Sequence, residues 1–160
     1  MRTCLLLLLL VWGSAVFAQD PDSQRFSNTL YIQPYSKLRQ AAEHGDAESQ
    51  YGLAYLYYKA GSDPAIVGVV QSYKLAAQWY RKAAQQGHTS AQYNMAVLHL
   101  QGEGVERDPI EAYAWLLHSS SAGHEASLAL IKELNGVLNE KQINIARERS
   151  ATLGITPPKP

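Results

Sequence analysis

Apolar residues recur at helical spacing along most of the chain, and Gly, Asp, Asn or Pro separates one such segment from the next. Apolar positions three or four residues apart predict amphipathic helices. Alternation with a period of two, which would indicate strands, is absent from the sequence outside Leu30–Ile32. The expected helices therefore cover residues 35–44, 47–60, 72–86, 89–100, 109–121 and 125–137, and a last helix follows the capping residue Asn139.

The helical segments repeat. Trp79 and Trp115 stand 36 residues apart, and residues 41–56 match residues 83–98 at an offset of 42. Similarity at a period near 36 is typical of a solenoid of helix pairs, in which each pair covers the apolar face of its neighbour. The sequence predicts an all-α superhelical solenoid of about three helix hairpins with a C-terminal capping helix.

The first residues differ from the rest. Met1–Ala18 has one basic residue, then a short apolar run, and ends in small residues at the expected cleavage site. This is the pattern of a secretory signal peptide cleaved near Ala18. The apolar run is shorter than the roughly 20 residues that cross a bilayer. We expect a signal peptide at 1–18, a mobile leader at 19–33, the repeat domain at 34–153 and a Pro-rich tail at 154–160. The mature protein would then be periplasmic or secreted, without stable membrane insertion.

Composition narrows the function classes. The whole chain has 14 basic and 14 acidic residues, so it lacks the clustered positive charge of nucleic-acid-binding proteins. Its one cysteine, Cys4, lies in the predicted signal peptide, so we expect no disulfide in the mature chain. A chain with 46% hydrophobic residues can form a sizeable core by packing alone.

Several short motifs resemble the Sel1-like repeats, which are relatives of the tetratricopeptide repeats. The resemblance extends over roughly residues 38–137 and is carried by residues 76–84, Gly87-His88, residues 91–96, residues 102–105, Asp108 and residues 112–115. It implies a right-handed superhelix whose concave side, lined by the first helix of each pair, binds protein partners. It also implies that exported bacterial members act as adaptors.

Motifs that could carry chemistry are better explained by structure. Gly102 and Gly104 lack the strand-then-helix context of a phosphate loop and predict a turn. The five histidines show no metal-ligand spacing, and His88 and His124 occupy matching repeat positions. Ser119–Ser121 is expected to be a fraying helix end, and the acids at 103, 106 and 108 are expected to be solvated. We therefore expect no catalytic residue, no metal site and no cofactor.

Tyrosines supply the candidate binding surface. They recur on one face of the helix at 47–60, and aromatic side chains with a polar tip suit protein interfaces. Burial of Tyr51 and Tyr93 in the core is the alternative for these rings. Gln50 and Asn94 are each next to one of these two tyrosines on the helix surface, and we expect both side chains to be exposed. The candidate partner-binding residues are Tyr51, Tyr55, Tyr58, Gln50, Asn94, Val97 and Gln101. The apolar insertion at 64–70 is expected to pack on the domain or to form a further contact.

These observations favour an exported, non-catalytic protein-interaction module that binds a partner through its concave face. A toxin-neutralising immunity protein remains an alternative. So does a cell-envelope enzyme of β-lactamase-like type or a peptidoglycan-binding factor.

Overall fold

The computed structural model describes residues 35–63, 66 and 68–155, which form seven helices. These are α3 (Tyr35–Glu43), α4 (Ala47–Lys59), α5 (Tyr73–Gln85), α6 (Thr89–Gln101), α7 (Pro109–Ser121), α8 (Glu125–Asn135) and α9 (Glu140–Thr152). Every predicted helix is present, and the described residues contain no strand. The predicted signal peptide, the predicted leader and residues 156–160 of the tail lie outside the described residues.

Polar side chains start the helices where the sequence predicts. The Asp46 carboxylate accepts a hydrogen bond from the backbone N–H of Ser49, and Asp108 does the same for Ile110 and Glu111. Such caps satisfy backbone donors that the first turn leaves unpaired. Asn139 forms a reciprocal capping box with Gln142, as expected.

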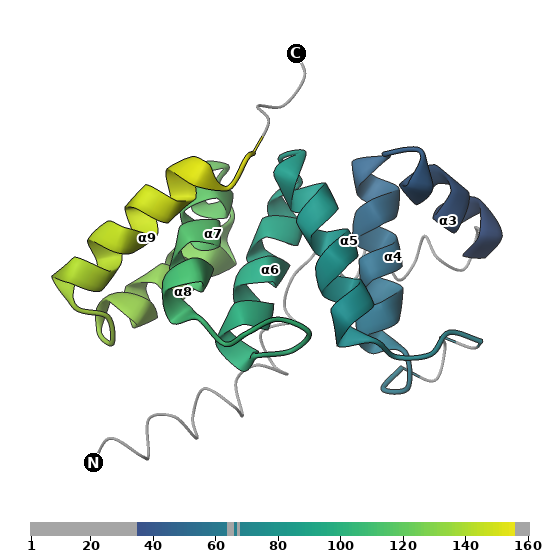
Figure 1. Cartoon of the computed structure of the whole chain (residues 1–160), viewed down its shortest axis with the longest axis horizontal. Helices are drawn as coiled ribbons and strands as arrows, with labels where there is room; N and C mark the ends of the chain where they lie inside the picture. The colour runs from purple at the N-terminus through teal and green to yellow at the C-terminus, as the bar shows by residue number, and fades with distance from the viewer. Residues whose placement is uncertain (1–34, 64–65, 67, 156–160) are drawn as a thin grey trace.

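The helices stack in chain order as a curved row (Figure 1). Consecutive helices from α3 to α8 pack against each other, while α9 packs on α7. The packed pairs are α4 with α5 and α6 with α7; α3 precedes them, and α8 and α9 both pack on α7. This arrangement confirms the all-α repeat solenoid.

Small residues let the helices approach closely. Ala76, Ala83, Ala91, Ala96 and Ala112 are all fully buried. The two repeat-matched tryptophans differ in their burial. Trp115 is buried, whereas Trp79 is only half-buried, and the Lys82 ammonium lies 4.0 Å from its ring centroid. Trp79 therefore packs at the edge of the core and gains a cation–π contact with Lys82.

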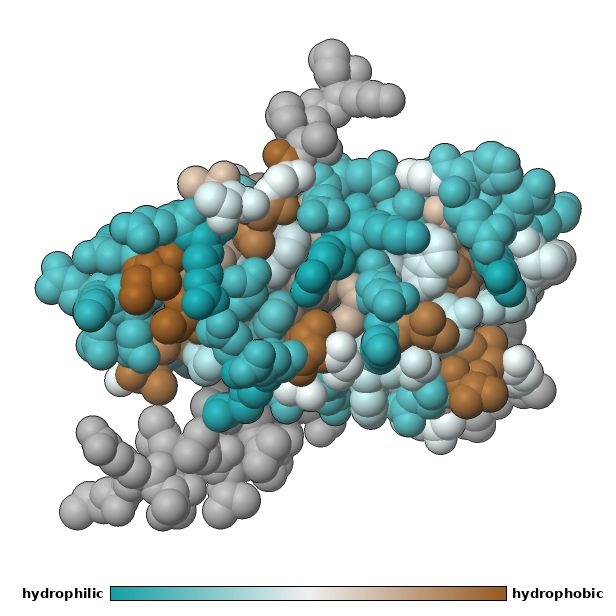
Figure 2. All heavy atoms as spheres, viewed as in Figure 1, coloured by the Kyte–Doolittle hydropathy of each residue, from teal (hydrophilic) through white to brown (hydrophobic). Residues whose placement is uncertain are grey.

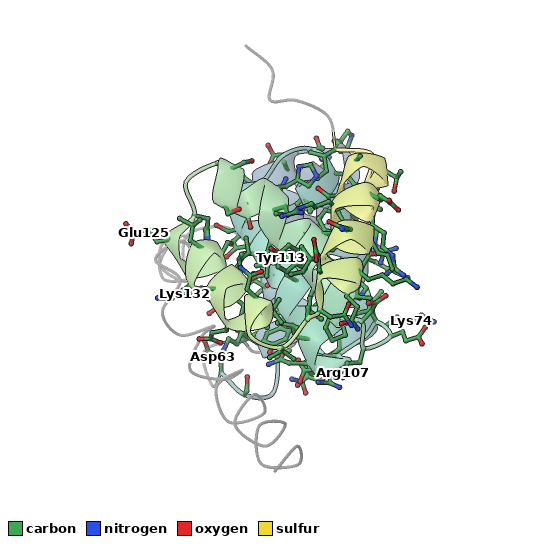
Figure 3. The ribbon with its side chains drawn as sticks, turned by 90° about the vertical axis from the view of Figure 1, so that its left-hand side faces the viewer. Asp63, Lys74, Arg107, Tyr113, Glu125 and Lys132 are labelled. Atoms are coloured by element: carbon green, nitrogen blue, oxygen red, sulfur yellow. The ribbon has the colours of Figure 1, made fainter. Side chains whose placement is uncertain are left out.

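The C-terminal end is held to α7 from two sides. The Tyr113 hydroxyl donates to the Asn135 side chain at 2.9 Å, which ties α7 to the end of α8. Figure 3 shows Tyr113 inside this end of the molecule, with Glu125 and Lys132 pointing outward. On the other side, Arg149 of α9 pairs with Asp108 and Glu111 at the start of α7.

The connection between α6 and α7 is a tight turn. Gly102 ends α6 with a φ of 75° and Gly104 has a φ of 72°, both in the left-handed region that favours glycine. A Cβ at Gly104 would overlap the backbone carbonyl of Tyr73, at the start of α5. The predicted structural turn is thus present, and it also lets the loop approach the preceding helix pair.

Part of the apolar insertion packs on the domain, as one of its two expected roles requires. Ile66 and Val69 pack against the core, while Val70 is 83% exposed. Pro64, Ala65 and Val67 lie outside the described residues.

Candidate protein-binding surface

The candidate binding residues lie deeper than the sequence suggested. The relative exposure is 4% for Gln50, 1% for Tyr51, 7% for Tyr55, 9% for Tyr58, 0% for Asn94 and 3% for Val97, and Gln101 is half-buried. The expected exposure of Gln50 and Asn94 was therefore wrong. Apart from Gln101, these side chains belong to four environments.

Tyr51 is a contact between two repeats. Its ring stacks on His88 with centroids 4.5 Å apart, and it meets Tyr80 of α5 at 5.6 Å. The equivalent Tyr93 meets His124 at 4.8 Å. Each histidine also caps the next first helix through Nδ1, as matching repeat positions predicted for a shared structural role. The core alternative for Tyr51 and Tyr93 is the one that the structure supports.

Gln50 joins adjacent helices. Its side-chain nitrogen donates to the backbone carbonyl of Ala42 at 3.1 Å, and Gln92 makes the same bond to Ala84, also at 3.1 Å. Both bonds end on a carbonyl at the C-terminal end of the preceding helix, which lacks an intrahelical donor. Gln86 also donates to the Gln50 side-chain oxygen at 2.7 Å. Gln50 was placed on the exposed surface because the sequence does not show that this carbonyl lies within its reach.

Tyr58 faces the loop of the next repeat. Its ring centroid lies 5.3 Å from that of Tyr73. Burial raises the pKa of Tyr58 well above its ordinary value, and the charge and hydrogen bond of the Glu103 carboxylate raise it further. Glu103 is half-buried, so its expected solvation was wrong. The carboxylate connects the α6–α7 loop to the end of α4.

Asn94, Val97 and Tyr55 define what we call the inner face, together with Ser90. On α6, residues 90, 94 and 97 follow one helical stripe, and Tyr55 is the α4 residue that matches Val97 at the repeat offset of 42. Burial raises the pKa of the Tyr55 hydroxyl, and the charge of Asp63 adds to this shift. The inner face therefore crosses two repeats, as expected for the first helices.

Tyr80 is a residue that sequence reasoning did not assign to this region. It is fully buried on α5, and burial raises the pKa of its hydroxyl well above the ordinary value. Its surroundings include Tyr51, Tyr55, Tyr58 and Asn94, whose amide acts to lower that pKa. Tyr80 and Asn94 thereby lie together where α5 packs on α6. A signal was present in the sequence, since Tyr80 shares the apolar stripe of Ala76, Ala83 and Ala84.

The serine run is also more ordered than expected. Ser119 is fully buried, and its hydroxyl lies 2.6 Å from that of Ser127, which in turn lies 3.0 Å from His124 Nδ1. Helix α7 ends at Ser121, as predicted, but the buried Ser119 holds that end in place, so the expected fraying was wrong. These groups fasten the α7–α8 turn, because His124 Nδ1 also faces the Ser127 backbone N–H at 3.3 Å.

The remaining ionisable side chains are not gathered into a cluster in the described residues. Within the described part of the chain, no group of three or more His, Cys, Asp or Glu residues is placed to hold a metal ion. No helix in those same residues is both long and apolar enough to span a bilayer. Figure 2 shows a largely hydrophilic surface broken by separate hydrophobic patches. The exposed large apolar residues include Leu128 and Val137, both near α8.

Comparison with known proteins identifies the repeats. Residues 47–88 and 89–124 match the family model described as "Sel1 repeat". The chitin synthase regulator SKT5 of Saccharomyces cerevisiae is 32% identical over 117 residues, which is 73% of this chain and 16% of that protein.

Two solved structures have a similar fold. The protective antigen c5321 of uropathogenic Escherichia coli strains, described as displaying an SLR fold, aligns with a TM-score of 0.65 at 24% identity, over 92% of this chain and 29% of the other. A Sel1 repeat protein from Oxalobacter formigenes aligns with a TM-score of 0.57 at 33% identity, over 62% of this chain and 27% of the other. The chain thus spans less than a third of the length of each of these proteins.

Proposed function

Since this chain belongs to the Sel1-repeat family, we propose that it is an exported, non-catalytic interaction module whose inner face holds a segment of a protein partner. Sel1-repeat proteins are generally protein-interaction modules, which supports the binding role. The yeast relative is named as a regulator of chitin synthase. The signal-peptide pattern of residues 1–18 supports export.

The observation that carries the proposal is the continuity of the inner face. Tyr55 on α4 and Val97 on α6 occupy equivalent positions of two successive repeats, so a single extended segment can contact both. Asn94 lies one turn from Val97 and adds an amide with one donating and one accepting end. Tyrosine and valine would anchor the segment, and the amide would fix its direction.

A binding experiment with matched variants tests this role. Proteins retained by the purified chain from an envelope extract are identified, and the strongest candidate is purified and titrated directly. We expect Tyr55→Ala to weaken that binding by at least about tenfold, as removal of an interface anchor does, with an unchanged helical circular dichroism spectrum. Leu128→Ser, on α8 and outside the inner face, serves as the control and should bind like the wild type. Equal binding by the Tyr55 variant would exclude the inner face as the docking site.

Export is tested separately. N-terminal sequencing of the protein from the periplasm or the culture medium should begin at Gln19. Recovery only from the cytoplasm, with Met1 retained, would contradict this part of the proposal.

A further inference from the structure

Each first helix presents one stripe of residues, here called the stacking stripe, to the repeat that follows it. On α4, the Gln50 side chain accepts a hydrogen bond from Gln86 at 2.7 Å. Its neighbour Tyr51 stacks on His88, and both contacts come from the turn just before α6. On α6, the equivalent Tyr93 meets the histidine that precedes α8. The stacking stripe is therefore the surface on which successive units pack, and it is buried on α4 and α6.

The stacking stripe of α8 is exposed. Leu128 and Ala129 occupy the positions that hold a glutamine and a tyrosine 36 residues earlier, on α6. Leu128 is 54% exposed, and Ala129 is exposed as well. Glu125 and Lys132 lie about one turn to either side of Leu128, and Figure 3 shows both of them pointing outward from α8. Because α9 packs on α7 instead, no described unit follows on this stripe.

The side chains of this stripe do not suit a further repeat of the same kind. A following unit would bring a histidine ring, but position 129 is alanine and offers no ring to stack on. It would also bring an amide donor, but position 128 is leucine and accepts no hydrogen bond. The stripe offers instead one aliphatic side chain beside a small residue, and small side chains at a contact let two helices approach closely.

The charges of the stripe identify the helix that fits it. Glu125 and Lys132 are seven residues apart, which is about 10.5 Å along the helix axis. Neither side chain is in an ion pair with another described residue. When a second α8 crosses Leu128 in the antiparallel direction, the carboxylate of each copy faces the ammonium of the other. A parallel pairing would bring like charges together. The stripe is thus complementary to itself under a two-fold rotation.

We propose that α8 is an association face for a second copy of this chain, with the two α8 helices antiparallel and Leu128 at the centre. The stripe covers about two helical turns, so the pairing buries less than the roughly 800 Å² per partner of a standard interface. The dimer is therefore weak and forms as protein concentration rises. This inference goes beyond the proposed function and does not depend on it, since the stripe lies outside the inner face.

Reversing the charges tests the pairing. Sedimentation of the purified chain is followed from about 10 µM to about 1 mM, where weak association is measurable. Glu125→Lys and Lys132→Glu each place like charges together at both ends of the contact. We expect each variant alone to raise the dissociation constant of the dimer at least about tenfold. An equal mixture of the two should recover the wild-type affinity, because every ammonium then faces a carboxylate again.

Matched controls separate the interface from the fold. Glu148→Lys makes the same charge change at an exposed position of α9 and should dimerise like the wild type. Both α8 reversals oppose the helix dipole, so the helical circular dichroism of each variant is compared with the wild type. Leu128→Asp, which keeps both charges of the stripe, should abolish the dimer. Leu75→Asp, at the exposed leucine of α5, should leave it unchanged.

The opposite results are equally specific. A wild-type chain that stays monomeric up to about 1 mM would overturn the proposal. Equal association of the wild type and Leu128→Asp would assign the dimer to another face and overturn it as well. A mixture of the two reversed variants that fails to associate would exclude the antiparallel pairing. Capture of a different protein by a monomeric chain, lost in Leu128→Asp, would assign the stripe to that protein and also overturn the proposal.

Discussion

At the scale of single residues, two histidines connect successive repeats. The Nδ1 atom of His88 accepts from the backbone N–H of Ala91 at 3.2 Å, so the neutral ring carries its proton on Nε2. That Nε2 faces the Glu48 carboxylate at 3.2 Å, and the ring stacks on Tyr51. His124 repeats the cap and the tyrosine contact one unit later. One side chain thereby starts a helix and fixes that helix against the previous repeat.

Separating the two roles of His88 gives the first prediction. His88→Asn keeps a capping side chain and loses the ring, whereas His88→Ala loses both. We expect His88→Ala to lower the free energy of unfolding by about 1.5–3 kcal/mol, and His88→Asn by about half of that. Urea unfolding with an unchanged m-value measures both. Glu48→Gln is the control, since the contact of the His88 ring with this largely exposed carboxylate contributes less than about 1 kcal/mol. Equal losses for the Asn and Ala variants would show that the cap contributes nothing.

His99 gives a prediction about pH. It is buried on α6, its Nδ1 lies 3.1 Å from the Glu106 carbonyl, and its Nε2 has no hydrogen-bond partner among the described residues. Burial lowers the pKa of His99 from its ordinary 6.5, and the carbonyl only partly opposes this. Arg81 adds to the shift, while Glu111 and Asp108 oppose it. The unfolded chain therefore takes up the proton first as pH falls.

The sign follows from linkage. The contribution of His99 to stability is fully present above pH 6.5 and declines as pH falls towards the lowered folded-state pKa. We expect the free energy of unfolding to decrease between about pH 7 and pH 5, and His99→Gln to flatten that decrease. A steeper slope in the His99 variant would contradict the assignment.

At this scale, the sequence predicted the structural roles of residues at repeated positions better than it predicted which side chains are buried. It predicted the histidine role and the turn glycines because each follows from a repeated position. It placed Gln50 and Asn94 at the surface because both are polar residues beside an apolar stripe, and the sequence alone predicts such residues to be exposed. Only the fold brings the Ala42 carbonyl to Gln50 and places Asn94 beside Tyr80. The binding role of all seven candidate residues stays a prediction.

At the scale of elements, the α6–α7 loop connects one repeat to the preceding one. Glu103 reaches Tyr58 at the end of α4, and Gly104 lies against the backbone of Tyr73 at the start of α5. Arg107 also donates to the carbonyl of Leu100 at 2.9 Å, which closes the loop on its own helix. The family motif at residues 102–105 therefore forms a turn and also packs one helix pair against the preceding one.

Two glycines with similar backbones separate these effects. Gly104 and Gly45 have φ angles of 72° and 96°, but a Cβ at Gly45 meets nothing within 4 Å. We expect Gly45→Ala to cost about 1 kcal/mol from backbone strain alone. Gly104→Ala should cost at least about 2 kcal/mol more, because the added methyl overlaps backbone that cannot rotate away. Thermal and urea unfolding of the two variants measure the difference. Equal costs would mean that the loop moves away from α5 freely.

At the scale of the whole molecule, the fold was predictable because the hydrophobic period, the caps and the repeat offset all indicate the same helix pairs. The ends of the array were less predictable, since a terminal pair has a neighbour on one side only. Leu38 and Ala42 are the buried residues of α3. At the other end, α8 exposes Leu128 by 54% and packs mainly on α7. Stability in such an array depends on the neighbours of each helix.

A gradient of local stability follows, with α6 and α7 at its maximum. Both lie between other helices, so their amides should exchange only through the largest opening of the domain. Those of α3 and α8 should exchange through openings that cost at least about 2 kcal/mol less. Native-state hydrogen exchange at low denaturant, read by mass spectrometry, measures each helix. Leu134→Ala, which removes a buried contact of α8, should speed exchange in α8 while α4 keeps its rate. One common opening free energy for all helices would show instead that the repeats unfold as a single cooperative unit.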